Sequence, residues 1–180
     1  MASSNGIPDC GEFTSKECSL LGKKSALANS CREYTFYSPL GMFTGVDIIF
    51  DRTRLCLEQI LNTSIEQQVP VKAHATIECV FYKMMSFTDE GAEPQAITSY
   101  FSSKAMPILN QDDMEEFFER NIETLSSMVE KFTQCGSSWI LIECKTLTLR
   151  LVKYTPNSIL SSSSKVTKSA NDNATWHIYE

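Results

Sequence analysis

Residues 110–135 read NQDDMEEFFERNIETLSSMVEKFTQC, and their apolar side chains recur at intervals of three and four residues. This spacing gathers seven of them into one stripe along a helix: Met114, Phe118, Ile122, Leu125, Met128, Val129 and Phe132. Asn110 is a suitable N-cap, and Asp113 stands at the third helical position, as in a capping box. Gly136 is suited to the left-handed conformation with which helices end. The sequence therefore predicts a helix over these residues.

Another helix is predicted over Arg52–Gln67, where apolar residues again recur at helical spacing. Asp51 can cap this helix, and Pro70 prevents it from continuing. Its start stays open, because Val46–Phe50 suits either the first turns of the same helix or a short strand before it.

Two stretches between the helices predict a β-hairpin. Apolar and polar residues alternate along Val71–Met84, which gives a strand with one buried and one wet face. Ala96–Met106 shows the same alternation. The loop between them contains Asp89, Gly91 and Pro94, which are typical turn residues.

The last predicted strand, Trp139–Tyr154, changes phase along its length. Its apolar residues share one parity before residue 145 (Ile140, Ile142, Cys144) and the other parity after it (Leu147, Leu149, Leu151). A β-bulge inserts one extra residue and so shifts the alternation by one position. We therefore expect a bulge near Lys145 or Thr146.

An early strand at Arg32–Ser38 completes the order strand, helix, strand, strand, helix, strand. This is the order of the ferredoxin-like split βαβ (βαββαβ) fold, an antiparallel sheet with two helices on one face. We expect an α+β domain of this kind over residues 31–156, with a different strand order as the alternative.

The two ends of the chain show little hydrophobic periodicity. Residues 1–30 are expected to be weakly structured, and residues 157–180 form a Ser-rich segment without a core of its own. The more apolar residues 174–179 are a candidate edge strand.

Composition limits the classes of function and the compartment. The chain has 180 residues, 42% hydrophobic content and a net charge of -6, which argues against coating nucleic acid by bulk electrostatics. This net charge does not exclude a local basic face. The seven cysteines are odd in number and form no C-x-x-C pair, so we expect reduced thiols in the cytoplasm or nucleus. No apolar run approaches the length of a membrane span.

Catalytic motifs are missing from the sequence. His74 and His177 are the only histidines, which leaves no histidine metal cluster, and no glycine-rich phosphate loop occurs. The acidic residues that begin the helix at 110–135 are explained by its dipole. No strand carries a pair of Asp residues, as a polymerase palm requires. We therefore expect no catalytic residue, no metal and no cofactor.

The wet face of the predicted sheet is the remaining candidate site. Aromatic and basic side chains there would stack bases and neutralise phosphates, as in sheets that bind RNA or single-stranded DNA. The candidate nucleic-acid-binding residues are Lys72, His74, Tyr82, Tyr100, Lys104, Arg150 and Lys153. Glu78 and Thr148 share that face, and any solvated sheet face has similar composition.

Four stretches carry a resemblance to a known family: Ser99-Tyr-Phe-Ser-Ser-Lys, Met128-Val-Glu-Lys-Phe, Gly136-Ser-Ser-Trp-Ile-Leu and Leu149-Arg-Leu-Val-Lys-Tyr-Thr-Pro156. Together they resemble the region N-terminal to the catalytic domain of Maverick/Polinton-type protein-primed family B DNA polymerases. The matching positions are Gly136, Trp139, Lys153, Tyr154 and Pro156, whereas Ser138 stands where the family has glycine. The resemblance covers about residues 31–156.

The resemblance implies an accessory module of a virus-like mobile element, without the exonuclease and polymerase carboxylates. The family continues after the proline into a long catalytic portion, and here a Ser-rich run follows Pro156. Two functions therefore compete. The chain binds DNA or RNA as a non-catalytic accessory to replication or transposition, or it contacts a protein partner, or itself, through the sheet face or an edge strand.

Overall fold

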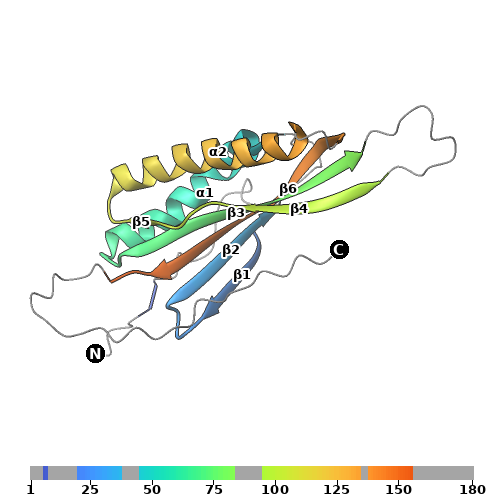
Figure 1. Cartoon of the computed structure of the whole chain (residues 1–180). Helices are drawn as coiled ribbons and strands as arrows, with labels where there is room; N and C mark the ends of the chain where they lie inside the picture. Colours follow the sequence, from blue (N-terminus) through green and yellow to red (C-terminus); the bar gives the residue numbers. More distant parts are fainter. Residues whose placement is uncertain (1–5, 8–19, 38–44, 84–94, 135–137, 156–180) are drawn as a thin grey trace, which may run out of the picture.

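Two helices lie on one face of a six-stranded antiparallel sheet in the computed structural model of the chain (Figure 1). The structure describes residues 6–7, 20–37, 45–83, 95–134 and 138–155. The elements in chain order are β1 (Leu20–Ala26), β2 (Cys31–Tyr37), α1 (Val46–Glu66), β3 (Val71–Lys83), β4 (Ala96–Ser102), β5 (Met106–Ile108), α2 (Gln111–Gln134) and β6 (Trp139–Lys153). The expected α+β class, with both helices on one face of an antiparallel sheet, is confirmed.

The order of the strands differs from the ferredoxin-like order that we expected. Neighbouring strands follow the sequence β1-β2-β6-β3-β4, and β5 pairs with β3 beyond the end of β4. In the ferredoxin-like sheet the strands that precede the helices are central, whereas here β6 and β3, which follow the helices, take these places. They are also the longest strands, with 15 and 13 residues. Central places let both of their edges form backbone hydrogen bonds.

The β-bulge expected near Lys145 is confirmed. Glu78 of β3 pairs with Thr146 of β6, but the next residue, Cys79, pairs with Cys144, so Lys145 has no partner on β3. A second register shift follows between Val80 and Phe81. The shift at Lys145 explains why Cys144 and Leu147, which differ in parity, are both buried on the helix side of the sheet. The second shift restores the first parity, so Leu141 faces the helices and Ile140, which the alternation had placed on the buried side, is exposed on the opposite face.

Strand β1 lies within residues 1–30, where the sequence showed no strand pattern. It pairs with β2 through a turn in which Leu27, Ala28 and Asn29 all have positive φ. Ile7 is buried and its backbone N–H donates to the carbonyl of Asn29 at 2.8 Å. Part of the segment expected to be weakly structured therefore belongs to the fold.

The helix α1 begins earlier than its predicted range. Val46–Phe50 forms its first turns, and the N-cap is Gly45, with an extended backbone and no side-chain hydrogen bond, rather than Asp51. The start of α2 agrees with the prediction: the backbone N–H of Asp113 donates to Asn110 Oδ1 at 3.0 Å, and the N–H of Asn110 donates to Asp113 Oδ2 at 3.2 Å. This is a reciprocal capping box.

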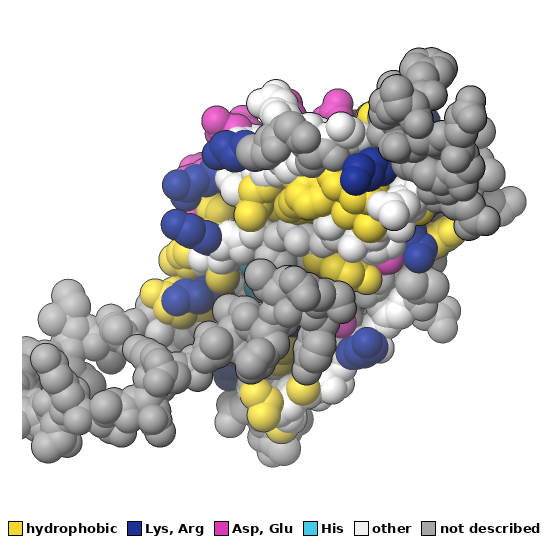
Figure 2. Space-filling view, turned by 45° about the vertical axis from the view of Figure 1, so that its right-hand side comes forward, with side chains coloured by type: hydrophobic (Ala, Val, Ile, Leu, Met, Phe, Trp, Pro, Cys, Tyr) yellow, Lys and Arg dark blue, Asp and Glu magenta, His cyan; other side chains and the backbone are white. Residues whose placement is uncertain are grey.

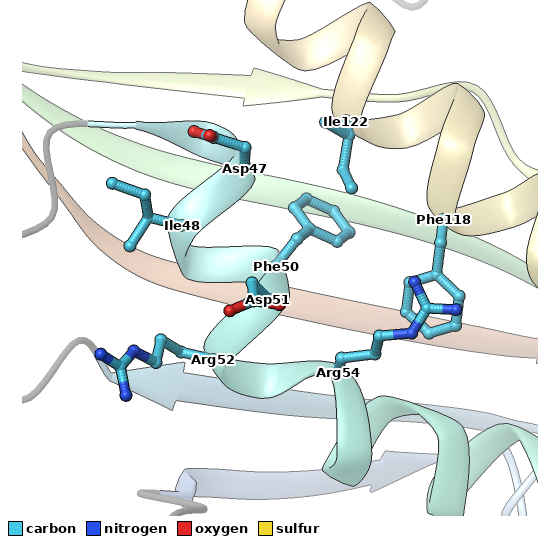
Figure 3. Close-up of a pocket in the computed structure, with 8 residues that line it drawn as sticks. All are labelled: Asp47, Ile48, Phe50, Asp51, Arg52, Arg54, Phe118 and Ile122. Carbon is cyan, nitrogen blue, oxygen red and sulfur yellow. The ribbon is translucent and has the colours of Figure 1, made fainter.

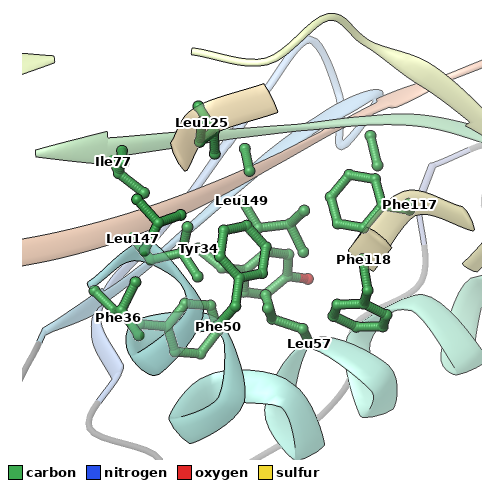
Figure 4. Close-up of a cluster of buried hydrophobic side chains, with 14 of the residues drawn as sticks. Tyr34, Phe36, Phe50, Leu57, Ile77, Phe117, Phe118, Leu125, Leu147 and Leu149 are labelled. Atoms are coloured by element: carbon green, nitrogen blue, oxygen red, sulfur yellow. The ribbon is translucent and has the colours of Figure 1, made fainter. Parts of the chain in front are cut away.

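The hydrophobic core fills the space between the helices and the inner face of the sheet (Figure 4). Its largest fully buried side chains come from both layers: Tyr34, Phe36, Phe50, Phe81, Phe117 and Phe118 among them. The predicted hairpin of β3 and β4 is confirmed by its antiparallel register. On its inner face the rings of Phe81 and Phe101 meet edge to face, with centroids 6.1 Å apart.

One cysteine contradicts the expectation that all thiols are reduced. Cys56, buried on α1, forms a disulfide bond. Cys31, Cys79 and Cys144 are free thiols. The argument for an intracellular location from reduced cysteines is therefore lost, because disulfides persist mainly in oxidising compartments.

Several expectations fall outside the described residues. These are the turn residues Asp89, Gly91 and Pro94, the helix stop Gly136, and the segment 157–180 with its candidate edge strand. Among the described helices, none combines the length and apolarity that crossing a bilayer requires.

Candidate binding face

The side chains that point away from α1 and α2 form what we call the outer face of the sheet. They sit in rows, because residues paired in the register of neighbouring strands point to the same side. One row runs across four strands from Tyr37 through Thr146 and Glu78 to Tyr100. A parallel row joins Lys24, Glu33, Arg150 and His74.

The charges in the second row are paired. Arg150 Nε donates to Glu33 Oε2 at 3.1 Å, and Lys24 Nζ lies 3.8 Å from Glu33 Oε1. Both cations are largely solvated, so these ion pairs add little to stability. Their effect is on the surface potential, because Glu33 offsets part of the positive charge.

The same arrangement recurs around the bulge. Lys145 Nζ lies 3.3 Å from Glu78 Oε1, and Thr146 Oγ1 donates to Glu78 Oε2 at 3.0 Å. The hydrogen bond to Glu78 raises the pKa of Lys145 above its ordinary value. The bulge turns Lys145 to the outer face, so this cation depends on the register shift.

His74 lies half-buried beside Arg150 on the outer face. Burial, and secondly the positive charge of Arg150, lower the pKa of His74 below its ordinary value, although Glu33 opposes this shift. The imidazole is therefore held neutral near physiological pH and supplies a hydrogen-bonding group rather than a charge.

Hydroxyl groups occupy the row between the two charged rows. Thr35 Oγ1 and Thr148 Oγ1 lie 3.3 Å apart, and Thr76 Oγ1 and Ser102 Oγ lie 2.8 Å apart. Hydroxyls both donate and accept, so this row can hydrogen-bond phosphate oxygens or peptide groups.

Three tyrosines are the most exposed aromatic side chains of the outer face. Tyr100 has 66% of its surface exposed, Tyr37 44% and Tyr82 41%. Strand geometry separates them by roughly 14–16 Å, so a ligand that touches all three must be extended. At the other end of the face, Lys72 Nζ lies 4.6 Å from the ring centroid of Tyr154.

Five of the seven predicted site residues lie together on the outer face: Lys72, His74, Tyr82, Tyr100 and Arg150. The other two do not. Lys104 lies after the end of β4, in the connection to β5, so the parity of β4 no longer applies to it. Lys153 pairs with the buried Val71 and therefore has the parity of the inner face.

Several residues of the face were missed by the sequence analysis, Tyr37 and Lys145 among them. Tyr37 ends β2 on the parity opposite to the buried Tyr34 and Phe36, a signal that the sequence did contain. Lys145 is placed by the bulge, whose exact residue the alternation did not decide.

Charge is divided unequally between the two layers of the fold. α1 and α2 together contain eleven acidic and four basic residues, whereas the strands contain three acidic and eight basic ones. Figure 2 shows most Asp and Glu side chains at the upper margin, where Figure 1 has the helices, and separate Lys and Arg side chains below them. The excess of negative charge therefore lies in the helical layer and not in the strands.

A pocket of about 450 Å³ lies between the N-terminal half of α1 and the helix α2 (Figure 3). Arg54 crosses it, with its guanidinium 4.7 Å from the ring centroid of Phe118 and hydrogen bonds of 2.6 Å to both Glu58 and Glu115. The hydrogen bond with Glu115 is the main cause that raises the pKa of Arg54. This cation is already neutralised, so the pocket does not suit an anionic ligand.

No group of three potential metal ligands occurs within residues 6–7, 20–37, 45–83, 95–134 and 138–155. No protein-family model, curated protein or solved structure matches the chain.

Proposed function

We propose that the chain is a non-catalytic module that binds single-stranded nucleic acid on the outer face of its sheet. The observation that carries the proposal is the exposure of Tyr37, Tyr82 and Tyr100 on a face that also bears hydroxyls and cations. Bases of every kind stack on exposed aromatic rings, and each stacked base contributes about 1–3 kcal/mol.

The division of charge supports the sheet rather than the helices as the contact surface. The outer face carries four cations (Lys24, Lys72, Lys145, Arg150) against three carboxylates (Glu33, Glu78, Glu143), whereas the two helices carry eleven acidic residues against four basic ones. A phosphate backbone is attracted to the first surface and repelled by the second. The bound strand would therefore lie across β6 and β3.

A single strand fits this face better than a duplex. Its bases are free to stack, whereas the bases of a duplex are already stacked on one another. Glu33 and Glu78 offset Arg150 and Lys145. The electrostatic contribution is therefore moderate, and stacking has to supply much of the affinity.

The biological role that we propose is an accessory one in DNA replication or transposition. It follows from the resemblance to the region ahead of the catalytic domain in Maverick/Polinton-type polymerases. The proposal assigns no reaction to the chain.

Titration of labelled single-stranded and duplex DNA and RNA at two salt concentrations tests the proposal. We expect single strands to bind more tightly than duplexes, with an affinity that falls as salt rises. A Lys72→Ala, Arg150→Ala double variant should bind more weakly, and Lys131→Ala, which changes an exposed cation on α2, should bind like the wild type. Salt-independent binding, or no binding at micromolar protein, would contradict the proposal.

One observation favours protein docking as the second candidate function. The paired carboxylates reduce the positive potential of the outer face, and two aliphatic side chains are exposed on it: Ile140, which pairs with Tyr82, and Val152, which pairs with Lys72. Tyrosine with aliphatic side chains is typical of protein interfaces. Light scattering over a range of protein concentrations tests the simplest form, self-association through this face. A Tyr82→Ala variant should then shift the equilibrium toward monomer.

A further inference from the structure

A groove of about 540 Å³ separates α2 from the connection between β4 and β5. α2 runs alongside this connection and β5 (Figure 1). Small-ligand sites in proteins have this range of volume and combine apolar walls with a few fixed polar groups. The groove has both, with Met106 and Met128 as apolar lining and Asn121 and Lys104 as polar lining.

Asn121 lines the groove and has a buried hydrogen-bond acceptor that no described residue satisfies. Its side chain is 2% exposed, and Nδ2 donates to the carbonyl of Phe117 at 2.6 Å. That bond fixes which end of the amide is which, because a carbonyl accepts only from the NH2 group. Oδ1 has no hydrogen-bond partner among the residues that the structure describes. Leaving such an acceptor unpaired in a buried site is costly, so a ligand that donates to it gains affinity.

Lys104 supplies the free positive charge at the rim of the groove. It is exposed and forms no ion pair with any described residue. Arg120 also lines the groove, but its Nη1 lies 3.1 Å from Glu116 Oε1, so this charge is offset. The groove therefore offers one buried acceptor and one unpaired cation.

The thioethers of Met106 and Met128 complete the chemistry of the groove. Methionine sulfur makes favourable contacts with aromatic rings and adapts to flat ligands. A ligand that fits has a planar ring with an N–H donor and carries a negative charge. A nucleotide has all three features.

We propose that this groove holds one nucleotide of the bound single strand, with the amino group of its base donating to Asn121 Oδ1 and its phosphate beside Lys104. This inference rests on the proposed function, because the strand reaches the groove from the outer face. Ser102 joins the two surfaces: it lines the groove, and its hydroxyl lies 2.8 Å from Thr76 Oγ1 on the outer face.

The groove should select among bases. Adenine, cytosine and guanine present exocyclic amino groups, whereas uracil and thymine present one N–H between two carbonyl oxygens that would repel Oδ1. We therefore expect adenosine monophosphate to bind more tightly than uridine monophosphate. The loss of one hydrogen bond of this kind corresponds to roughly a 3- to 10-fold change in affinity.

Methionine methyl resonances of the full chain, labelled with carbon-13, provide the test. The resonances of Met106 and Met128 are assigned with Met106→Leu and Met128→Leu, and the probes are adenosine monophosphate, uridine monophosphate, adenosine and a short oligodeoxyadenylate. Saturable shifts of these two methyls support the inference if the affinity that they give is higher for adenosine monophosphate than for the other monomers. No saturable shift with adenosine monophosphate or the oligonucleotide overturns it.

Two variants test the roles of the polar groups. Asn121→Leu should abolish the preference for adenosine monophosphate over uridine monophosphate without lowering the thermal midpoint, because it removes an unpaired buried acceptor. Lys104→Ala should bring the affinity for adenosine monophosphate down to that for adenosine. An unchanged base preference in Asn121→Leu would overturn the assigned contact.

The same experiment separates this inference from the proposed function. An oligonucleotide that binds on the outer face without shifting the Met106 and Met128 methyls supports the proposed function and overturns the groove. Methyl shifts with adenosine monophosphate but no binding of any oligonucleotide support the pocket and overturn the binding of a strand. Tyr100→Ala should weaken the oligonucleotide and leave the monophosphate unaffected, because Tyr100 lies outside the groove.

Discussion

The two faces of β3 and β6 show how one pair of strands serves both folding and binding. Their inner faces are apolar and almost fully buried: Ala73, Ala75, Ile77, Cys79 and Phe81 on β3, and Cys144, Leu147, Leu149 and Leu151 on β6. Their outer faces alternate with these positions and carry hydroxyls, paired charges and an exposed tyrosine. Stability should therefore depend on one parity of residues and binding on the other.

The largest expected effect is on stability at the inner face. Leu149→Ala, at a position with 0% exposure, should lower the free energy of unfolding by about 2–5 kcal/mol, because it leaves a cavity between sheet and helices. Its neighbour on the outer face, Thr148→Ala, should lower it by no more than about 1 kcal/mol. Urea unfolding of both variants gives the comparison. Similar losses in the two would show that the outer face also carries the fold.

The next effect is on binding at the outer face. Tyr100→Ala should weaken the binding of single-stranded nucleic acid by about 1–3 kcal/mol, because a stacked base loses its ring. Its stability should change by less than about 1 kcal/mol, since Tyr100 is mostly exposed on the edge strand β4. Tyr100→Phe keeps the ring and is the matched control. Fluorescence titration measures the affinity of both variants. An equal loss of affinity in Tyr100→Phe would rule out stacking as the cause.

A smaller effect should come from the paired charges. Glu78→Gln removes the carboxylate that lies 3.3 Å from Lys145 Nζ and frees this cation for a phosphate. The affinity for single strands should then rise, and its dependence on salt should steepen by about one phosphate contact. Glu119→Gln, an exposed carboxylate on α2, is the control and should change neither quantity. An unchanged salt dependence in Glu78→Gln would place Lys145 outside the contact surface.

The smallest effect concerns pH and His74. Its pKa is lower in the folded chain than its ordinary value of about 6.5, so the unfolded chain takes up a proton first as the pH falls. This contribution to stability is present above pH 6.5 and is lost as the pH falls below it. His74→Gln should therefore lose less stability than the wild type between pH 7.5 and pH 5.5, as measured by urea unfolding. A greater loss in the variant would mean that the pKa of His74 is raised instead.

Local patterns predicted much of the fold. The capping box joins Asn110 and Asp113, which are three residues apart in the chain, so it needs no tertiary information. The bulge at Lys145 could be found because a phase change along a single strand reports it directly. The five correctly placed residues of the candidate site follow from the same alternation along β3, β4 and β6.

Pairing between distant segments was harder to predict. Alternation shows which side of each strand is buried, but it does not say which strand lies next to it. The central place of β6 between β2 and β3 therefore could not be read from the pattern, although the length of β6 is consistent with a central strand. β1 lacks a clear alternation, and Lys104 was misplaced because β4 ends at Ser102, before the apolar pattern does.

The location of the bound strand tests the central claim most directly. Backbone amide resonances of the chain labelled with nitrogen-15, followed during titration with a short single-stranded oligonucleotide, report which surface meets the ligand. We expect the largest shifts at outer-face residues of β3, β4 and β6, around Glu78, Tyr100 and Arg150, and small shifts along the exposed sides of α1 and α2. Shifts that concentrate on the helices, or none at saturating ligand, would contradict the account.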